Sequence, residues 1–160
     1  MTSMQTSPDR AGPPSHRAQL QELIGSMRVT QLIYVAATLG IADQLQGGPK
    51  SIDELAATAA VDTQALYRVL RALASHGIFA ETGACHFALT PQAELLRDDV
   101  PGSLRAWAMM LGGESFWKPW GELLACVKTG ETAFQRVFGM GRWEYLATHP
   151  DAAATFNRRG

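Results

Sequence analysis

Apolar residues recur at spacings of three and four from residue 17 to residue 45, which predicts one long helix. The positions that carry this pattern are Leu20, Leu23, Ile24, Met27, Leu32, Val35, Ala36 and Leu39. We expect Gly40 to interrupt the helix, with a last turn at 41–45 before Gly47-Gly48-Pro49 ends it. Further apolar residues at 33–37 fill the gaps, so this helix needs cover on most sides. A second copy of the chain is the expected cover.

The segment from residue 51 to residue 90 has the pattern of a helix–turn–helix followed by a β-hairpin. Ser51 and Glu54 form a capping box that begins a short helix ending at Ala60. Asp62 is expected to cap the next helix, and Gly77 to follow its last turn. The buried positions of that second helix are Leu66, Val69, Leu70 and Leu73.

Alternation of apolar and polar residues at 78–81 and 86–89 predicts two strands joined by a Thr-Gly turn. No strand pattern longer than this hairpin occurs in the sequence. Thr90 and Pro91 are typical of the N-cap and first position of a helix, which we expect to reach Leu96. Residues 98–102 then form a linker.

Aromatic residues dominate the part of the chain that follows the linker. Nine of the thirteen aromatics lie between Trp107 and Phe156. Helices are predicted at 103–111, 116–127, 141–148 and 151–159. The expected fold is mainly α, with a winged-helix-like domain, one small β-hairpin and additional C-terminal helices. Its boundaries are a flexible tail at 1–16, the winged-helix-like domain at 17–102 and a helical segment at 103–160.

The charge of the winged-helix-like segment argues against binding to nucleic acid. A DNA-binding domain needs surplus Lys and Arg, because neutralising phosphates supplies most of the affinity. Residues 51–90 contain two arginines and four carboxylates, a formal charge of 2 − 4 = −2. The whole chain has a net charge of −1. We therefore expect no nucleic-acid partner.

Composition places the chain among ordered proteins without a membrane partner. A hydrophobic content of 46% is enough for a core. The longest nearly apolar run, residues 32–41, is too short to span a bilayer, and residues 1–16 lack the apolar region of a signal peptide. Cys85 and Cys126 form no CxxC motif, which favours a reducing, cytoplasmic location.

No residue pattern predicts catalysis by this chain alone. The four histidines never fall at metal-ligand spacing, and neither cysteine has a basic cluster beside it. The glycines at 112–113 and 139–141 do not follow an apolar strand, as a nucleotide-binding loop would require. We expect no catalytic, cofactor-binding or metal-binding residue here.

The aromatic and methionine-rich segment is the one candidate for ligand binding. Its residues are Met109, Met110, Trp117, Trp120, Phe134, Phe138, Met140 and Trp143. One interpretation is a core and a dimer interface, which are enriched in aromatic residues. The other is an apolar pocket for a flat organic molecule. Different faces of the segment could serve both purposes.

In their order along the chain, several stretches resemble the N-terminal part of the S-adenosylmethionine-dependent small-molecule O-methyltransferases. The stretches are AATLGIAD at 36–43, LYRVLRALASHGIF at 66–79, TP at 90–91, WGELL at 120–124, GE at 130–131, FG at 138–139 and FNR at 156–158. Each stretch is short, but their succession covers residues 20–160 without a change of order. The resemblance implies that 17–102 is a dimerisation domain interlocked with its twin, and that 103–160 forms a wall of the substrate pocket.

The resemblance also implies which functional parts would follow residue 160. In the family, a Rossmann-like domain carries the glycine-rich cofactor loop and a histidine that deprotonates the acceptor hydroxyl. The methyl donor of a full-length member is S-adenosylmethionine, and we expect these 160 residues alone to bind none. We also expect them to transfer no methyl group unless another chain supplies the cofactor domain.

Five residues are expected to contact a small aromatic or polyketide-like substrate. Met110 and Phe156 match family positions that pack on the aromatic acceptor. Met27 lies on the first helix, from which a partner subunit reaches into the neighbouring pocket. Trp107 and Trp120 are added because of the local aromatic density. All five would desolvate and orient an acceptor hydroxyl.

Two alternative functions remain open at the level of sequence. The first is a winged-helix, ligand-responsive regulator, which would require a basic recognition helix that Asp62, Arg68 and Arg71 do not provide. The second is a stand-alone dimeric binding protein for apolar small molecules, which the aromatic segment would permit.

Overall fold

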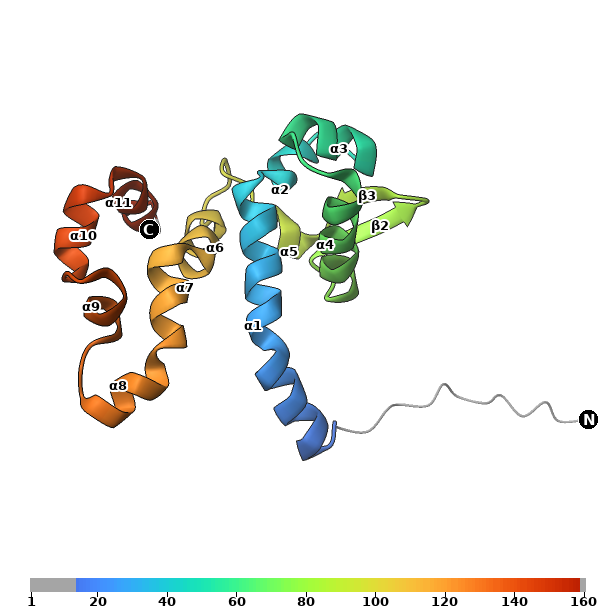
Figure 1. The fold of residues 1–160 in the computed structure, drawn as a ribbon. Helices are drawn as coiled ribbons and strands as arrows, with labels where there is room; N and C mark the ends of the chain where they lie inside the picture. Colours follow the sequence, from blue (N-terminus) through green and yellow to red (C-terminus); the bar gives the residue numbers. More distant parts are fainter. Residues whose placement is uncertain (1–13, 159–160) are drawn as a thin grey trace, which may run out of the picture.

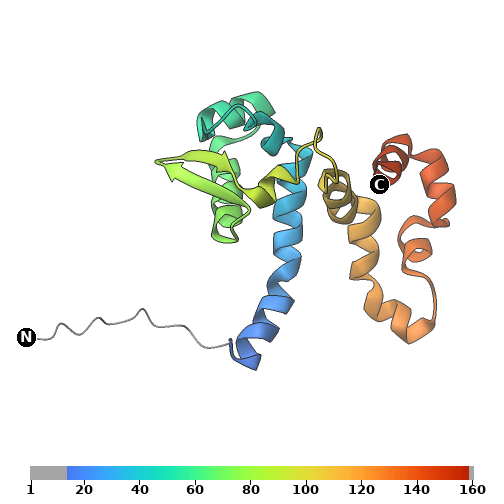
Figure 2. The ribbon, with the colours of Figure 1, turned by 180° about the vertical axis from the view of Figure 1, so that it is seen from behind.

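Helix α1 (His16–Thr38) stands between two groups of elements in a computed structural model that describes residues 14–158 (Figure 1). The first group comprises α2 (Ile41–Gln44), β1 (Lys50–Ser51), α3 (Ile52–Ala59), α4 (Thr63–Ser75), β2 (Phe79–Gly83), β3 (His86–Leu89) and α5 (Pro91–Glu94). The second comprises α6 (Arg105–Gly112), α7 (Glu114–Gly121), α8 (Leu123–Thr129), α9 (Ala133–Phe138), α10 (Arg142–Thr148) and α11 (Pro150–Asn157). The view from behind shows the same order (Figure 2). The mainly α fold expected from the sequence is confirmed.

The predicted break in the first helix is confirmed at Gly40. Gly40 has a φ of 63°, in the left-handed region that glycine adopts without a steric penalty. Helix α1 ends at Thr38, and α2 starts again at Ile41 in a new direction. The predicted tail at 1–16 lies outside the described residues except for 14–16, where the Ser15 hydroxyl caps α1 by accepting from the N–H of Ala18.

The predicted helix caps of the winged-helix-like group are also present. Ser51 and Glu54 form the capping box of α3, and the Asp62 carboxylate accepts from the N–H of Ala65 at 2.7 Å to cap α4. Gly77, at a φ of 73°, ends α4 in a Schellman motif, with the N–H of Ile78 donating to the carbonyl of Leu73. These local signals fix where each helix begins and ends.

The sheet differs from the sequence expectation in two ways. A third strand, β1, pairs with β3, so the order is β1–β3–β2 and all pairs are antiparallel. Strand β1 has only two residues, too few to show an alternation of apolar and polar positions, so the sequence pattern did not predict it. The turn lies at 84–85 rather than at Thr82-Gly83, because β2 continues through Gly83 with an irregularity after Glu81. Cys85 takes the positive φ of 60° that the sequence favoured for glycine.

The core lies where α1, α2, α3, α4 and the sheet meet. Its largest fully buried side chains are Phe79, Phe87, Ile41, Leu45, Leu55, Leu70 and Leu73. The ring of Tyr67 contacts Phe87 edge-on with a centroid distance of 6.0 Å. Burying each Leu or Phe contributes on the order of 1.5–3 kcal/mol, so this core stabilises the packing of the first group against α1.

The helices after residue 103 are shorter and more numerous than expected. The segment predicted as one helix at 116–127 is divided at Glu122 into α7 and α8, three residues after Pro119. Helix α9 was not predicted, because Gly130 and Gly139 on either side suggested only turns. Figure 1 shows these helices as an arch on the side of α1 that faces away from the sheet.

Acid is expected to weaken the start of α3 through Glu54. Its carboxylate accepts from the N–H of Ser51 at 2.9 Å and from the Ser51 hydroxyl at 2.8 Å, which lowers its pKa from the ordinary 4.5. A carboxylate whose pKa is lower in the folded than in the unfolded state stabilises the fold at pH values above its unfolded pKa. That stabilisation is lost as the pH falls through its folded pKa. Glu54→Gln should therefore lower the Tm at neutral pH, with the difference shrinking below about pH 4.5. Thermal melts between pH 3 and pH 7 would measure this.

The matched control is Glu144→Gln, because the Glu144 carboxylate makes no hydrogen bond to another described residue. A Tm difference between wild type and Glu54→Gln that stays constant with pH would contradict the expectation.

Candidate functional site

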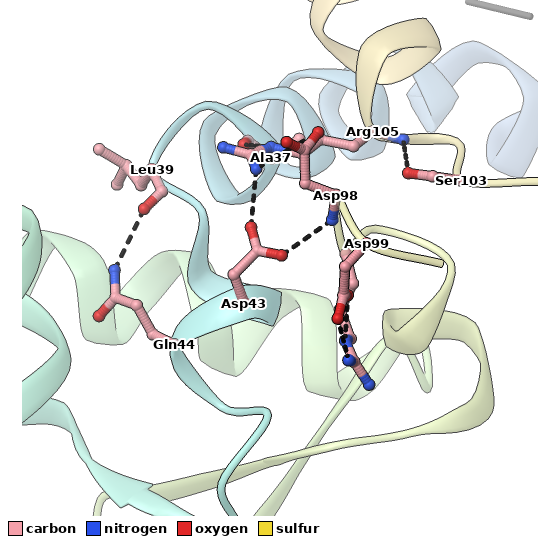
Figure 3. A network of polar contacts seen from close by, with 9 residues as sticks. Ala37, Leu39, Asp43, Gln44, Asp98, Asp99, Ser103 and Arg105 are labelled. Carbon is pink, nitrogen blue, oxygen red and sulfur yellow. Dashed lines mark hydrogen bonds and ion pairs between the residues drawn. The ribbon is translucent and has the colours of Figure 1, made fainter. Parts of the chain in front are cut away.

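Helix α6 carries two of the five expected contact residues, and its N-terminal end is fixed by Arg105 (Figure 3). The Arg105 guanidinium donates from Nε to the carbonyl of Ala37 at 2.9 Å and from Nη1 to Oδ2 of Asp43 at 2.7 Å. The other oxygen of Asp43 accepts from the N–H of Asp98 at 2.8 Å. Arg105 thus joins α6 to the end of α1 and to α2, and Asp43 joins α2 to the linker that precedes α6.

The C-terminal end of α6 is fixed by a close approach to α1. A Cβ atom at Gly112 would lie 2.8 Å from Cδ2 of Tyr34 and would overlap its Cβ and Cγ. The side-chain amide of Gln31 donates to the carbonyl of Gly112 at 3.1 Å. Gly112 therefore lets α6 touch α1, and the residues between Arg105 and Gly112 are held at both ends.

Met27 and Trp120 lie on opposite sides of one open groove. This tryptophan groove, of about 700 Å³, is lined by residues that include Ser26, Thr30, Leu111 and Trp117 in addition to those two. Met27 and Trp120 are 57% and 67% exposed. The groove therefore has apolar walls that no described residue covers.

Trp107 belongs to a second recess, which we call the apolar groove. It measures about 360 Å³ and is lined mainly by apolar side chains of α1, of α6 and of the segment between α5 and α6, among them Ile33, Leu96, Leu104 and Ala108. Trp107 is 48% exposed. Thr30 and Leu111 line both this groove and the tryptophan groove, so the two are neighbours.

Met110 lines a third recess, the methionine cavity, on the other side of α6. The cavity measures about 280 Å³ and combines Met109 and Met110 with Tyr34, Ser115, Tyr145 and Asp151. Met110 is only 6% exposed, so its role in the cavity is to present a buried apolar surface. Tyr34, Ser115 and Asp151 were not singled out in the sequence, because neither spacing nor residue type relates them.

Phe156 lies beside Met110 in a tightly packed aromatic cluster. Both residues border a small gap with Phe116, Phe134 and Arg142. The ring of Phe156 meets Trp143 edge-on at 6.0 Å, and the Arg142 guanidinium lies over Phe116 at 4.7 Å. The structure therefore brings Met110 together with Phe156 and Met27 together with Trp120, while Trp107 lies apart from both pairs.

These recesses combine apolar surfaces with a few polar groups, an arrangement that suits the binding of an organic molecule. Across residues 14–158, no group of three His, Cys, Asp or Glu residues could hold a metal ion. Glu114 pairs with Lys118, and that hydrogen bond lowers the pKa of Glu114 and keeps it ionised.

Within residues 14–158, none of the helices has both the length and the apolar character that a membrane-spanning helix needs.

Comparison with known proteins gives these recesses a context. Residues 21–99 match the model of the O-methyltransferase dimerisation domain. The phenazine O-methyltransferase PhzM of Lysobacter antibioticus is 45% identical over 95% of this chain and 44% of that protein. The crystal structure of LaPhzM has a TM-score of 0.88 at 44% identity, over 91% of this chain and 44% of that one.

A third similar protein was solved with ligands bound. It is the O-methyltransferase NcsB1 from neocarzinostatin biosynthesis, in complex with S-adenosylmethionine and 2-hydroxy-5-methyl naphthoic acid. Its TM-score is 0.72 at 30% identity, over 84% of this chain and 42% of that one. The chain spans less than half the length of these relatives, and the resemblance stated from the sequence is confirmed for that part.

Proposed function

Because residues 21–99 belong to the family of O-methyltransferase dimerisation domains, we propose that this chain is the dimerisation and acceptor-binding part of a methyltransferase. The methyl donor of the complete activity is S-adenosylmethionine, and the acceptor is a hydroxyl group of a small aromatic or polyketide-like molecule. The chain acts as a homodimer. It works in the cytoplasm, where its two free thiols, Cys85 and Cys126, stay reduced.

The observation that carries the dimer is an uncovered apolar stripe on the N-terminal half of α1. Leu20, Leu23, Ile24 and Met27 are 58%, 69%, 69% and 57% exposed. Four large apolar side chains at spacings of three and four form one face of a helix, and a helix face of this kind is stable when it is covered. A second copy would cover it, in keeping with the family to which this domain belongs.

The same stripe links the dimer to the acceptor. Met27 belongs both to the stripe and to the tryptophan groove, which it lines together with Trp120 of α7. A subunit that covers the stripe would also close this groove and exclude water from it. Met110, Phe156 and Trp107 then supply apolar surfaces around α6 on which a flat acceptor packs.

The described residues do not fit the methyl donor itself. A nucleotide-type cofactor site needs backbone N–H groups in a glycine-rich loop after a buried strand. The three strands in residues 14–158 all belong to the winged-helix-like group, and Gly112-Gly113 and Gly139 follow helices. These residues therefore bind, orient and desolvate the acceptor, and no step of methyl transfer is assigned to them.

Placing a charge in the stripe is expected to break the dimer. Wild-type protein should have twice the 17.3 kDa mass of one chain. Leu23→Glu removes a Leu that the dimer would bury and adds a charge that must be desolvated, so the dimer dissociation constant should rise at least about tenfold. Sedimentation equilibrium would measure it.

Ala18→Glu is the matched control, because at 100° per residue Ala18 lies on the face of α1 opposite the stripe. A monomeric wild type would contradict the dimer, and equal dissociation constants for Leu23→Glu and Ala18→Glu would show that the stripe is not the interface.

A further inference from the structure

The methionine cavity differs from the two grooves in the number of polar groups that meet in it. Tyr34, Ser115, Tyr145 and Asp151 line it together with the apolar surfaces of Met109 and Met110. Organic-ligand sites in proteins have this character, with apolar walls and a few placed polar groups that fix orientation. A volume of about 280 Å³ suits one or two fused aromatic rings.

Four polar side chains of the cavity have no hydrogen-bond partner within residues 14–158, whereas Glu114 and Thr155, which also line it, each have one. No hydrogen bond joins the side chains of Tyr34, Ser115, Tyr145 or Asp151 to another described residue. Tyr145 is the most telling, because the residue is only 8% exposed and its ring is held by Phe138 and His149 at centroid distances of 4.6 and 3.7 Å. Among the described residues, only Oε1 of Gln44 is a fully buried side-chain polar atom without a partner, so the Tyr145 hydroxyl is open to solvent and can bind a ligand group.

The charge of the lining selects which polar group a ligand would bring. The Asp151 carboxylate serves as a hydrogen-bond acceptor, Glu114 brings a second carboxylate to the lining, and no Lys or Arg lines the cavity. Lys118 is paired with Glu114, and Arg142 lies over Phe116 and Phe134, where it borders a different recess. Helices α7 and α11 begin at the cavity and would favour an anion, but this effect is weaker than a hydrogen bond to a full charge.

We propose that the methionine cavity recognises a hydrogen-bond donor that carries no negative charge, such as an amino group, on an aromatic acceptor. The donor group binds the Asp151 carboxylate and the Tyr145 hydroxyl, while the rings pack on Met109 and Met110. This inference rests on the proposed acceptor-binding function and adds to it the class of acceptor. A carboxylate at the same ring position is disfavoured, because it would face Asp151.

Three matched naphthols test this with the full 160-residue chain. The probes are 3-amino-2-naphthol, 2-naphthol and 3-hydroxy-2-naphthoate, and their dissociation constants are measured by calorimetry. The amino compound should bind about tenfold more tightly than 2-naphthol, and the carboxylate more weakly than either. Asp151→Asn and Tyr145→Phe should each reduce the tenfold preference to less than about threefold.

Tyr67→Phe is the control variant, since the Tyr67 hydroxyl donates to Glu81 far from the cavity, and it should keep the full preference. Equal binding of all three probes, or tighter binding of the naphthoate, would overturn the inference and leave the acceptor-binding proposal intact. Binding of none of the three would overturn both. Sedimentation measures the dimer separately, so a failure of the dimer proposal can be distinguished from a failure of the ligand-binding proposal.

Discussion

Gly112→Ala is expected to destabilise the protein by about 3 kcal/mol, because the added methyl group overpacks the contact between α6 and α1. The new Cβ would overlap the first atoms of the Tyr34 side chain and lie 2.8 Å from its Cδ2. The Cβ atom of Tyr34 is bonded to the backbone and cannot move aside by changing a rotamer, so α6 must shift away from α1. Denaturant unfolding, followed by helical circular dichroism, would give the change in the free energy of unfolding.

Gly121→Ala provides the control for this substitution. Gly121 is also the last residue of its helix, but no atom lies within 4 Å of a Cβ built on it. Alanine should therefore be neutral or slightly stabilising there, because it restricts the unfolded chain. If both alanine variants unfold at the same denaturant concentration, the close approach at Gly112 does not determine the position of α6.

Arg105→Ala is expected to cost about 2–3 kcal/mol, the range for hydrogen bonds to charged groups in partly buried positions. The variant leaves the Ala37 carbonyl without its side-chain donor and Asp43 without its cation, while Asp43 keeps the N–H of Asp98. The side chains of Arg105 and Asp43 are only 20% and 33% exposed, so water replaces these bonds poorly. Unfolding measurements would check the loss, and hydrogen exchange should show faster opening of α6.

Two further variants serve as comparisons: Arg105→Lys separates the geometry of Arg105 from its charge, and Arg71→Ala measures an exposed ion pair. Arg105→Lys keeps the charge but lacks the forked donors, and it should recover only part of the stability. Arg71→Ala removes an ion pair with Glu81 in which the arginine is 63% exposed, and it should cost less than about 1 kcal/mol. An Arg105→Ala variant no less stable than Arg71→Ala would contradict the role given to Arg105.

Local signals predicted the winged-helix-like group well. Capping by Ser51, Asp62 and Thr90 involves a side chain and an N–H three residues later, so a short stretch of sequence contains the whole interaction. Gly40 and Gly77 were placed for the same reason, since a left-handed backbone conformation is a property of one residue. Strand β1 was missed because its two residues are ordered by pairing with β3, which no local pattern records.

The candidate site was predicted less completely, because its parts are distant in sequence. The resemblance to a family identified Met110 and Phe156, and the structure places both beside the same small gap. Aromatic density added Trp107 and Trp120, which lie in different grooves. Tyr34, Ser115 and Asp151 could not be grouped in advance, since they come from α1, α7 and α11.

The sequence by itself determined most of the helices, where those of the winged-helix-like group start and stop, and that the first helix carries an apolar face. Those properties depend on residues within a few positions of one another, where spacing and residue type decide the energy. Only the tertiary structure decided where α6 lies and what surrounds it. Arg105 and Gly112 fix it against α1 through contacts across more than sixty residues of chain, and such contacts exist only after packing has brought the segments together.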